Sequence, residues 1–146
     1  MPTVLETDDF IVKAHTEPHH SRENGGHIVI TPKTRYEHRY EMPIKLASKM
    51  MNLSQVLGEA FTNVMRSKGM DVVRINYQDN GNWAYKQPTK PPHLHLHLYA
   101  RTTNEKHPNN DPRFQAFPDA LVFPDRNTGY YEKFTALNEQ DCADIK

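Results

Sequence analysis

Apolar residues recur between residues 44 and 67 at the spacing of an α-helix. Successive members of the pattern are three or four residues apart, so they fall on one stripe of a helix with about 3.6 residues per turn. Pro43 suits the first turn, and Lys68 and Gly69 supply a basic last turn and a stop signal. The pattern predicts an amphipathic helix over about 44–67 with the buried stripe Leu46, Met50, Leu53, Leu57, Phe61 and Val64.

Four short segments have the composition of β-strands. They are residues 10–14, 27–31, 72–77 and 93–101. Residues 79–82, Asp-Asn-Gly-Asn, predict a hairpin or turn directly after the third strand. Because one long helix separates the strands and no strand–helix unit repeats, we expect an α+β domain with an antiparallel sheet.

The last third of the chain has a weaker pattern. Residues 102–128 are rich in Pro, Asn and Asp and predict a long loop. Tyr130, Phe134, Leu137 and residues 141–145 have rough helical spacing, which predicts a second amphipathic helix near the C-terminus. Since domains usually have about 100–200 residues, we expect residues 1–146 to form one domain.

The fourth strand segment contains three evenly spaced histidines. His93, His95 and His97 alternate with Leu94, Leu96 and Leu98. Because successive side chains of a strand point to opposite faces, the imidazoles share one face and the leucines pack against a core, with the long helix as their natural cover. Neighbouring imidazoles would lie about 6.5–7 Å apart, close enough to act on one ligand.

Three interpretations of this histidine face are open. It could be a solvated face that happens to be rich in histidine. It could be a metal site, because neutral imidazole is the commonest metal ligand, completed by His19, His20, His27 or His107. It could be a nucleophilic site, because a neutral imidazole is a good nucleophile near pH 7. The imidazole chemistry alone does not separate the last two interpretations.

Composition argues against several classes of function. The 18 basic and 18 acidic residues cancel, which disfavours a general nucleic-acid binder and a polybasic membrane-surface protein. No segment approaches the roughly 20 apolar residues that span a bilayer. The N-terminus carries acidic residues where a signal peptide would be basic, and the single Cys142 cannot form an internal disulfide. We therefore expect a cytoplasmic protein.

The histidine segment and its context resemble a known family. His93-Leu-His-Leu-His-Leu-Tyr99 resembles the His-φ-His-φ-His-φ-φ signature (φ is apolar) of the histidine triad (HIT) superfamily of nucleotide hydrolases and transferases. Residues 26–33, Gly-His-Ile-Val-Ile-Thr-Pro-Lys, are similar to a second segment of the family. The resemblance covers about residues 6–101 and leaves 102–146 as a C-terminal extension. It implies a five-stranded antiparallel sheet packed with one long helix, and a homodimer.

The resemblance also implies a reaction. His95 would attack the α-phosphorus of a nucleoside phosphoramidate or dinucleoside polyphosphate, and water or another acceptor would resolve the nucleotidyl-histidine intermediate. His93 and His97 would orient the phosphate and assist the leaving group, with His27 beneath the triad. No cofactor is required and no residue is assigned as a metal ligand, although a divalent cation could accompany the substrate.

The chain departs from the family pattern before the triad. Residues 87–92 replace the usual Gly-Gln-Ser/Thr element, and Thr89 or Lys90 could contact the phosphate instead. The amide that usually contacts the phosphate would be Asn82, or Gln78 if the loop is longer; Asn82 could equally be a plain turn residue. These departures favour an alternative of another class, a nucleotide-binding module without turnover.

His15, Trp83 and Arg22 carry further expectations. His15 stands where the family commonly has the acidic residue that holds the ribose, so the nucleoside specificity is open. Trp83 could stack on a base, although packing in the core is the commoner role of a tryptophan. We expect Arg22 to be a solvated loop charge. A His-ligated metalloprotein is the remaining alternative. The intact middle histidine favours the enzyme over the non-catalytic module, and the absence of a Cys-X-X-Cys or a nearby His/carboxylate triad of metal spacing weakens the metalloprotein.

Overall fold

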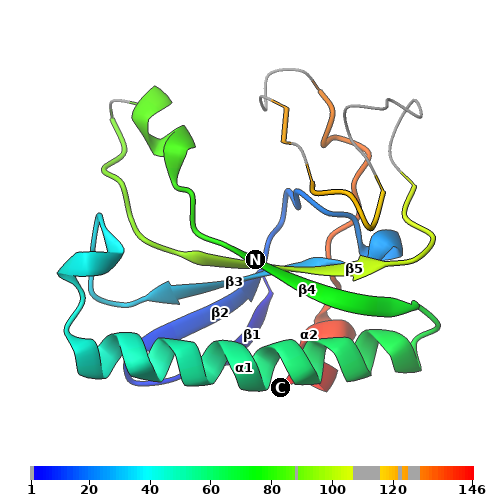
Figure 1. The fold of residues 1–146 in the computed structure, drawn as a ribbon, viewed down its shortest axis with the longest axis horizontal. Helices are drawn as coiled ribbons and strands as arrows, with labels where there is room; N and C mark the ends of the chain where they lie inside the picture. The colour runs from blue at the N-terminus through cyan, green and yellow to red at the C-terminus, as the bar shows by residue number, and fades with distance from the viewer. Residues whose placement is uncertain (1, 88, 107–115, 122, 125–128) are drawn as a thin grey trace.

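A five-stranded antiparallel sheet organises the chain, in the strand order β1-β2-β3-β5-β4 (Figure 1). The strands are β1 (Thr3–Glu6), β2 (Phe10–Ala14), β3 (His27–Pro32), β4 (Val72–Gln78) and β5 (Leu96–Thr102). The predicted α+β class and antiparallel sheet are confirmed. The computed structural model describes residues 2–87, 89–106, 116–121, 123–124 and 129–146.

Helix α1 (Ile44–Ser67) has the bounds that the apolar periodicity predicts. It runs along one face of the sheet, and the segments between β2 and β3 and between β4 and β5 lie on the opposite face (Figure 1). The core between α1 and the sheet is closed by fully buried side chains of both, among them Leu57, Phe61, Met65, Ile28 and Leu98. Burial of this apolar area is the main force that fixes the sheet against the helix.

The histidine segment enters the sheet later than predicted. Regular pairing of β5 begins at Leu96, opposite Ile30 of β3, so His93 and His95 lie on an extended segment just before the strand. Pairing with β4 also begins only at His97, because β4 stops at Gln78 opposite it. The alternation of faces nevertheless continues, since Leu94 is buried in the core while His95 is half-exposed.

Strand β1 was not predicted. Its residues pair with β2, with Leu5 opposite Val12, at one edge of the sheet. The turn predicted at residues 79–82 is not a tight hairpin either. Gly81 adopts a left-handed conformation before a 3-10 helix, η3 (Asn82–Lys86), and the connection from β4 to β5 spans residues 79–95.

The second helix is confirmed but shorter than predicted. Helix α2 (Glu139–Ile145) begins at a capping box formed by Asn138 and Asp141. Tyr130 and Phe134 precede it, in a segment where their rings pack edge to face at 5.2 Å. The helix starts where the capping box satisfies its first backbone N–H groups, and the upstream aromatic residues pack on each other in the loop before it.

The C-terminal helix is attached to the loop before β3 through a buried ion pair. The Arg22 guanidinium donates to both Asp141 carboxylate oxygens, at 2.7 and 2.9 Å, and Lys68 lies 3.2 Å from the same carboxylate. The expectation that Arg22 is a solvated loop charge is therefore wrong. A buried carboxylate needs such partners, because leaving it unpaired would cost several kcal/mol.

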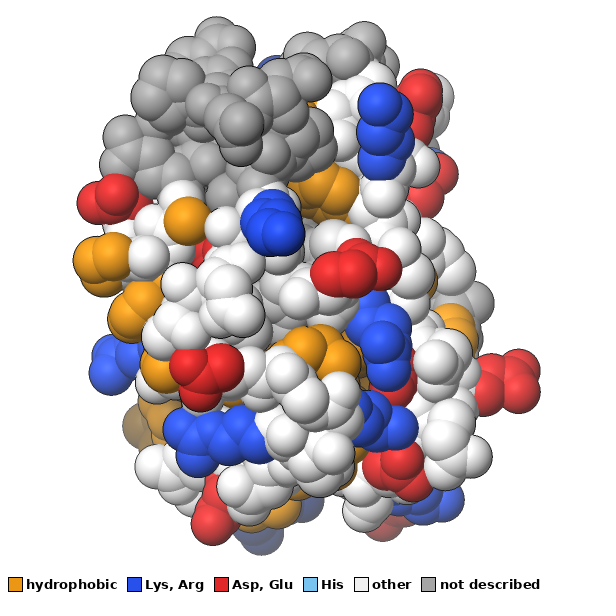
Figure 2. Space-filling model, turned by 90° about the vertical axis from the view of Figure 1, so that its right-hand side faces the viewer, with side chains coloured by type: hydrophobic (Ala, Val, Ile, Leu, Met, Phe, Trp, Pro, Cys, Tyr) orange, Lys and Arg blue, Asp and Glu red, His pale blue; other side chains and the backbone are white. Residues whose placement is uncertain are grey.

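The surface carries mixed charge. On the face drawn in Figure 2, basic and acidic side chains are interspersed. In the described part of the chain, none of the helices has the length and apolarity to cross a membrane.

Candidate active site

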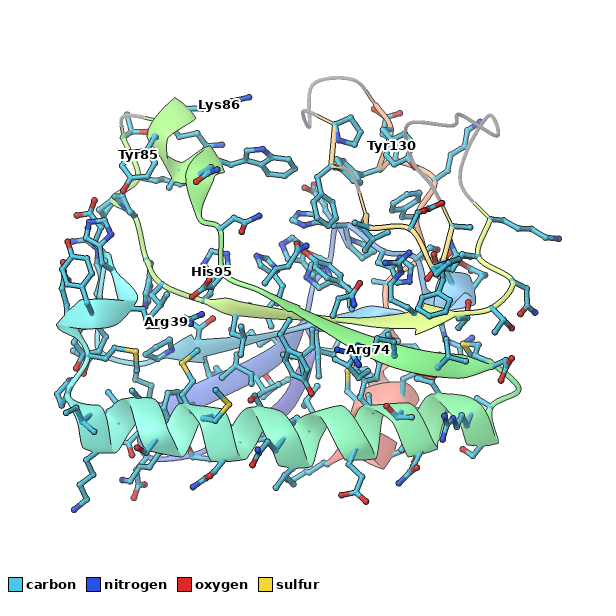
Figure 3. All side chains as sticks on the ribbon, viewed as in Figure 1. Arg39, Arg74, Tyr85, Lys86, His95 and Tyr130 are labelled. Atoms are coloured by element: carbon cyan, nitrogen blue, oxygen red, sulfur yellow. The ribbon has the colours of Figure 1, made fainter. Side chains whose placement is uncertain are left out.

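A cleft of about 990 Å³ contains the histidine segment. His93, His95 and His97 line it together with η3, residues 37–39 and Phe123 of the C-terminal segment. Figure 3 places His95 on the face of the sheet opposite α1, below the helix η3 that carries Tyr85 and Lys86. The predicted shared histidine face therefore opens into a hollow large enough for a nucleotide-sized ligand.

A hydrogen bond to the backbone decides which ring nitrogen of a neutral His95 carries the proton. Its Nδ1 lies 2.7 Å from the carbonyl oxygen of His93. A carbonyl oxygen can only accept, so Nδ1 must carry the proton and donate it. In a neutral His95 the other nitrogen, Nε2, then has an unshared electron pair, which is the state that a nucleophile requires.

His97 is oriented by a histidine beneath it. The main-chain N–H of His19 donates to His27 Nδ1 at 3.1 Å, and His27 Nε2 lies 2.8 Å from His97 Nδ1. Because His27 Nδ1 accepts, its Nε2 carries the proton and donates to His97 Nδ1. The proton of a neutral His97 is therefore on Nε2, where it can be donated to a ligand.

His27 is held neutral by its surroundings. Burial lowers the pKa of His27 well below its usual value, and the neighbouring His97 and His19 lower it further. Its ring stacks against that of His15, with the centroids 5.1 Å apart. A neutral His27 supports the direction of the hydrogen bond to His97.

The loop before β3 places His27 through a close backbone approach. Gly25 has a φ of +124°, and a Cβ at this position would lie 2.0 Å from the carbonyl oxygen of Ala100 on β5. Only glycine allows both the positive φ and this distance. The approach aligns the start of β3 with β5, where His27 pairs with Tyr99.

His93 is also fixed by a backbone carbonyl. Its Nε2 lies 3.0 Å from the oxygen of Pro32, so this nitrogen carries a proton and donates to the end of β3. The three triad histidines therefore have three different hydrogen-bond partners: a carbonyl on another strand, a carbonyl two residues away, and an imidazole.

The structure brings most of the other predicted site residues to the cleft. Asn82, Gln78 and Lys90 line it, and His27 lies buried behind His97. Thr89 is exposed and is not among the residues that line the cleft. Of the two predicted phosphate contacts in the 87–92 segment, Lys90 thus lines the cleft and Thr89 does not.

An aromatic group on one wall was not predicted from the sequence. The ring of His19 lies 5.0–5.6 Å from those of His27, His97, Trp83, Phe123 and Tyr131. Its Nδ1 also lies 3.2 Å from the hydroxyl of Tyr99. Trp83 therefore lies in the cleft wall and is not part of the hydrophobic core. The segments that supply these rings are far apart in the sequence, so only the fold reveals the group.

Charged side chains also line the cleft. Arg39 pairs with Asp79, and the Tyr85 hydroxyl donates to Glu37 at 2.9 Å. Lys86 lies on the same 3-10 helix as Tyr85 and also lines the cleft. The cleft thus has both aromatic and charged side chains in its lining, together with His95; its part lined by His19, Trp83 and Phe123 is called the aromatic end below.

Among the described residues, one group of histidines is close enough to hold a metal ion. It consists of His19, His27 and His97, with one ring nitrogen of each within 4.8 Å of the others. His20, which the sequence also offered as a ligand, is buried elsewhere, its Nε2 2.9 Å from the carbonyl oxygens of Asn24 and Ala100. His107 lies outside the described residues.

Solved structures share this fold. A HIT-like protein involved in cell-cycle regulation, from Bartonella henselae, matches with a TM-score of 0.60 at 17% identity, over 99% of this chain and 83% of that one. A hypothetical histidine triad nucleotide-binding protein from Sulfolobus tokodaii matches with a TM-score of 0.57 at 15% identity, over 98% and 79%. A zinc-bound histidine triad family protein from Mycobacterium smegmatis matches with a TM-score of 0.52 at 20% identity, over 80% and 73%.

Sequence comparison gives no such match: no family model matches the chain, and no curated protein does. The fold is nevertheless that of histidine triad proteins, and the resemblance noted in the sequence is confirmed at the level of the fold.

Proposed function

We propose that this chain, which has the histidine triad fold, is a nucleotide hydrolase or nucleotidyltransferase with His95 as its nucleophile. The observation that carries the proposal is the 2.7 Å hydrogen bond from His95 Nδ1 to the His93 carbonyl, which leaves Nε2 unprotonated in a neutral ring. A solvated histidine face would not need this arrangement, and a module that only binds nucleotides would not need an activated nitrogen.

The substrate class we propose is a nucleoside phosphoramidate or a dinucleoside polyphosphate. The aromatic end, with Trp83 and Phe123, suits stacking of a base. The basic side chains of Lys86, Lys90 and Arg39 also line the cleft and suit binding of a charged leaving group. A nucleoside monophosphate released from the aromatic end is the product we expect.

The reaction then has two balanced steps. The electron pair of His95 Nε2 forms a bond to the α-phosphorus, and the bond from phosphorus to the leaving nitrogen or oxygen breaks. The leaving group takes a proton from water in the cleft. Water next attacks the phosphorus and gives its proton to the hydroxide left by the first step. The phosphorus–nitrogen bond breaks, its electron pair returns to His95 Nε2, and the nucleoside monophosphate leaves. Between the two steps, His97 Nε2–H can hold a phosphate oxygen and stabilise its charge.

No cofactor is required in this proposal. The Nε2–H of His97 supplies a hydrogen bond to a phosphate oxygen, while the ring proton of His93 is held by the Pro32 carbonyl. A divalent cation could still arrive bound to a polyphosphate substrate. We expect hydrolysis of a phosphoramidate to continue in the presence of EDTA.

We also propose that the chain acts as a homodimer. β4 is an edge strand, and apolar side chains on it and on α1 are exposed: Ile44, Met51, Val56, Val73 and Tyr77. An exposed strand edge beside apolar side chains is a natural surface for a second copy. Sedimentation equilibrium would give twice the chain mass, and a Val56→Glu variant would shift it toward the monomer. A cytoplasmic location remains our expectation.

A panel of nucleoside phosphoramidates and dinucleoside polyphosphates tests the function, with His95→Asn as the variant. We expect turnover to fall about 10³-fold or more, because Asn has no nucleophilic nitrogen, with affinity for the nucleoside monophosphate within a few-fold of wild type. Retained turnover in His95→Asn would refute the role of His95. Tight nucleotide binding without turnover in the wild type would favour the non-catalytic module.

A further inference from the structure

Three imidazoles from separate segments meet beside the triad. His19 comes from the loop after β2, His27 from the start of β3, and His97 from β5. One ring nitrogen of each lies within 4.8 Å of the other two. Of the three, only His97 belongs to the triad, so the group is not the row of histidines that the sequence motif describes.

We propose that His19, His27 and His97 form a zinc site whose occupation blocks the catalytic arrangement of the triad. Zinc bound tetrahedrally by imidazoles at 2.0–2.1 Å needs nitrogens about 3.3 Å apart. The His27–His97 pair is at 2.8 Å and the widest separation in the group is at most 4.8 Å, so side-chain rotations of ordinary size bring the three nitrogens to that spacing.

The three imidazole nitrogens determine which metal ions the site can bind. Imidazoles suit Zn²⁺ and its neighbours in the transition series, while Mg²⁺ and Ca²⁺ prefer oxygen ligands. Three protein ligands leave one position open for water. His27 and His97 are buried and His19 is half-buried, so the site is closed on the side of the sheet.

Zinc and the His27–His97 hydrogen bond exclude each other. In the metal-free structure His27 Nε2 donates its proton to His97 Nδ1. A zinc ion needs the electron pairs of both nitrogens, so the proton of His27 must move from Nε2 to Nδ1. Nδ1 can then no longer accept the main-chain N–H of His19, and the hydrogen bonds that orient His97 are lost. Inhibition by zinc is the consequence, and this consequence rests on the proposed hydrolase function.

Zinc titration of the metal-free protein tests the site without any enzyme assay. We expect one Zn²⁺ per chain by isothermal titration calorimetry, and a visible spectrum typical of four-coordinate cobalt when Co²⁺ replaces it. His19→Ala and the gentler His19→Gln should each weaken zinc binding at least tenfold. His15→Ala is the matched control, because His15 contacts the same rings but lies outside the ligand group.

Each result is decisive. Absence of saturable 1:1 binding, or unchanged affinity in both His19 variants, would overturn the site. Equal loss of affinity in His15→Ala would overturn the ligand set. His95→Asn should bind zinc as wild type does, and a need for His95 would place the metal on the triad instead. A protein that binds zinc through His19 but never hydrolyses nucleotides would keep the site and remove the proposed function.

Discussion

The Nε2 of His27 lies 2.8 Å from the Nδ1 of His97, and this hydrogen bond decides which nitrogen of His97 offers a proton to the cleft. Replacing His27 by Ala leaves His97 Nδ1 and the His19 N–H without these partners inside the protein. We expect a loss of about 2–4 kcal/mol in the free energy of unfolding, measured with urea, and at least a tenfold fall in kcat/KM.

The control for this prediction is His15→Ala. It removes a ring that stacks on His27 but keeps the hydrogen bond to His97. Because His15 lines the cleft, the comparison is made on kcat, where the effect of His15→Ala should be much smaller than that of His27→Ala. Equal effects of the two substitutions would mean that the His27–His97 hydrogen bond has no special role.

Stability should fall as the pH drops below 6.5, because two histidines are buried in the neutral form. Burial lowers the pKa of His20 to about 4, and that of His27 also lies well below 6.5. In the unfolded chain both histidines have ordinary pKa values, so the unfolded state binds protons at a higher pH than the folded state does. Protonation therefore stabilises the unfolded state relative to the folded state as the pH falls. His20 alone should cost about 2 kcal/mol between pH 7 and pH 5.

Urea unfolding at the two pH values measures this loss, and His20→Gln is the informative variant. It removes one titrating group, so its stability should depend less steeply on pH than that of the wild type. A wild-type stability that is unchanged between pH 7 and pH 5 would show that these histidines are not held neutral.

Trp83 should report ligand binding directly. It is the only tryptophan of the chain, and it lines the cleft with its ring 5.2 Å from His19. A nucleotide base that stacks at the aromatic end must change the environment of the indole. Titration with a nucleoside monophosphate should give a saturable change in tryptophan fluorescence, in His95→Asn as in the wild type. Binding by equilibrium dialysis without a fluorescence change would place the base elsewhere.

Two glycines with positive φ should respond very differently to substitution by alanine. Gly25→Ala adds a Cβ that meets the Ala100 carbonyl oxygen at 2.0 Å, whereas Gly69→Ala, at a φ of +92°, meets nothing within 4 Å. We expect about 1–2 kcal/mol of destabilisation at Gly69, from backbone strain alone, and at least about 3 kcal/mol at Gly25. Similar losses of unfolding free energy in the two variants would contradict the close approach of the loop to β5.

The sequence was most informative where one local pattern decides the structure. The spacing of apolar residues located α1 to the residue, because a long amphipathic helix needs no distant partner to reveal its period. The alternation of residues 93–98 correctly separated the histidine face from the buried leucines. The start of β5 was predicted too early because pairing also depends on where the neighbouring strand β4 ends, which is at Gln78 opposite His97.

Features that depend on distant contacts could not be read from the sequence. β1 is a four-residue edge strand with little alternation, and only its pairing with β2 defines it. His19 lies in a polar loop, and its place among aromatic rings follows from the approach of that loop to β5 at Gly25. Arg22 looked like a loop charge because its partner, Asp141, lies 119 residues away.

The most direct test of the mechanism is to trap the intermediate on His95. Wild-type protein is mixed with adenosine phosphoramidate carrying radioactive phosphorus, quenched during turnover, and separated from free nucleotide. We predict label on the protein that is stable to base, labile to acid and absent from His95→Asn. Product formed with no labelled protein at any time, or equal labelling of His95→Asn, would contradict nucleophilic attack by His95.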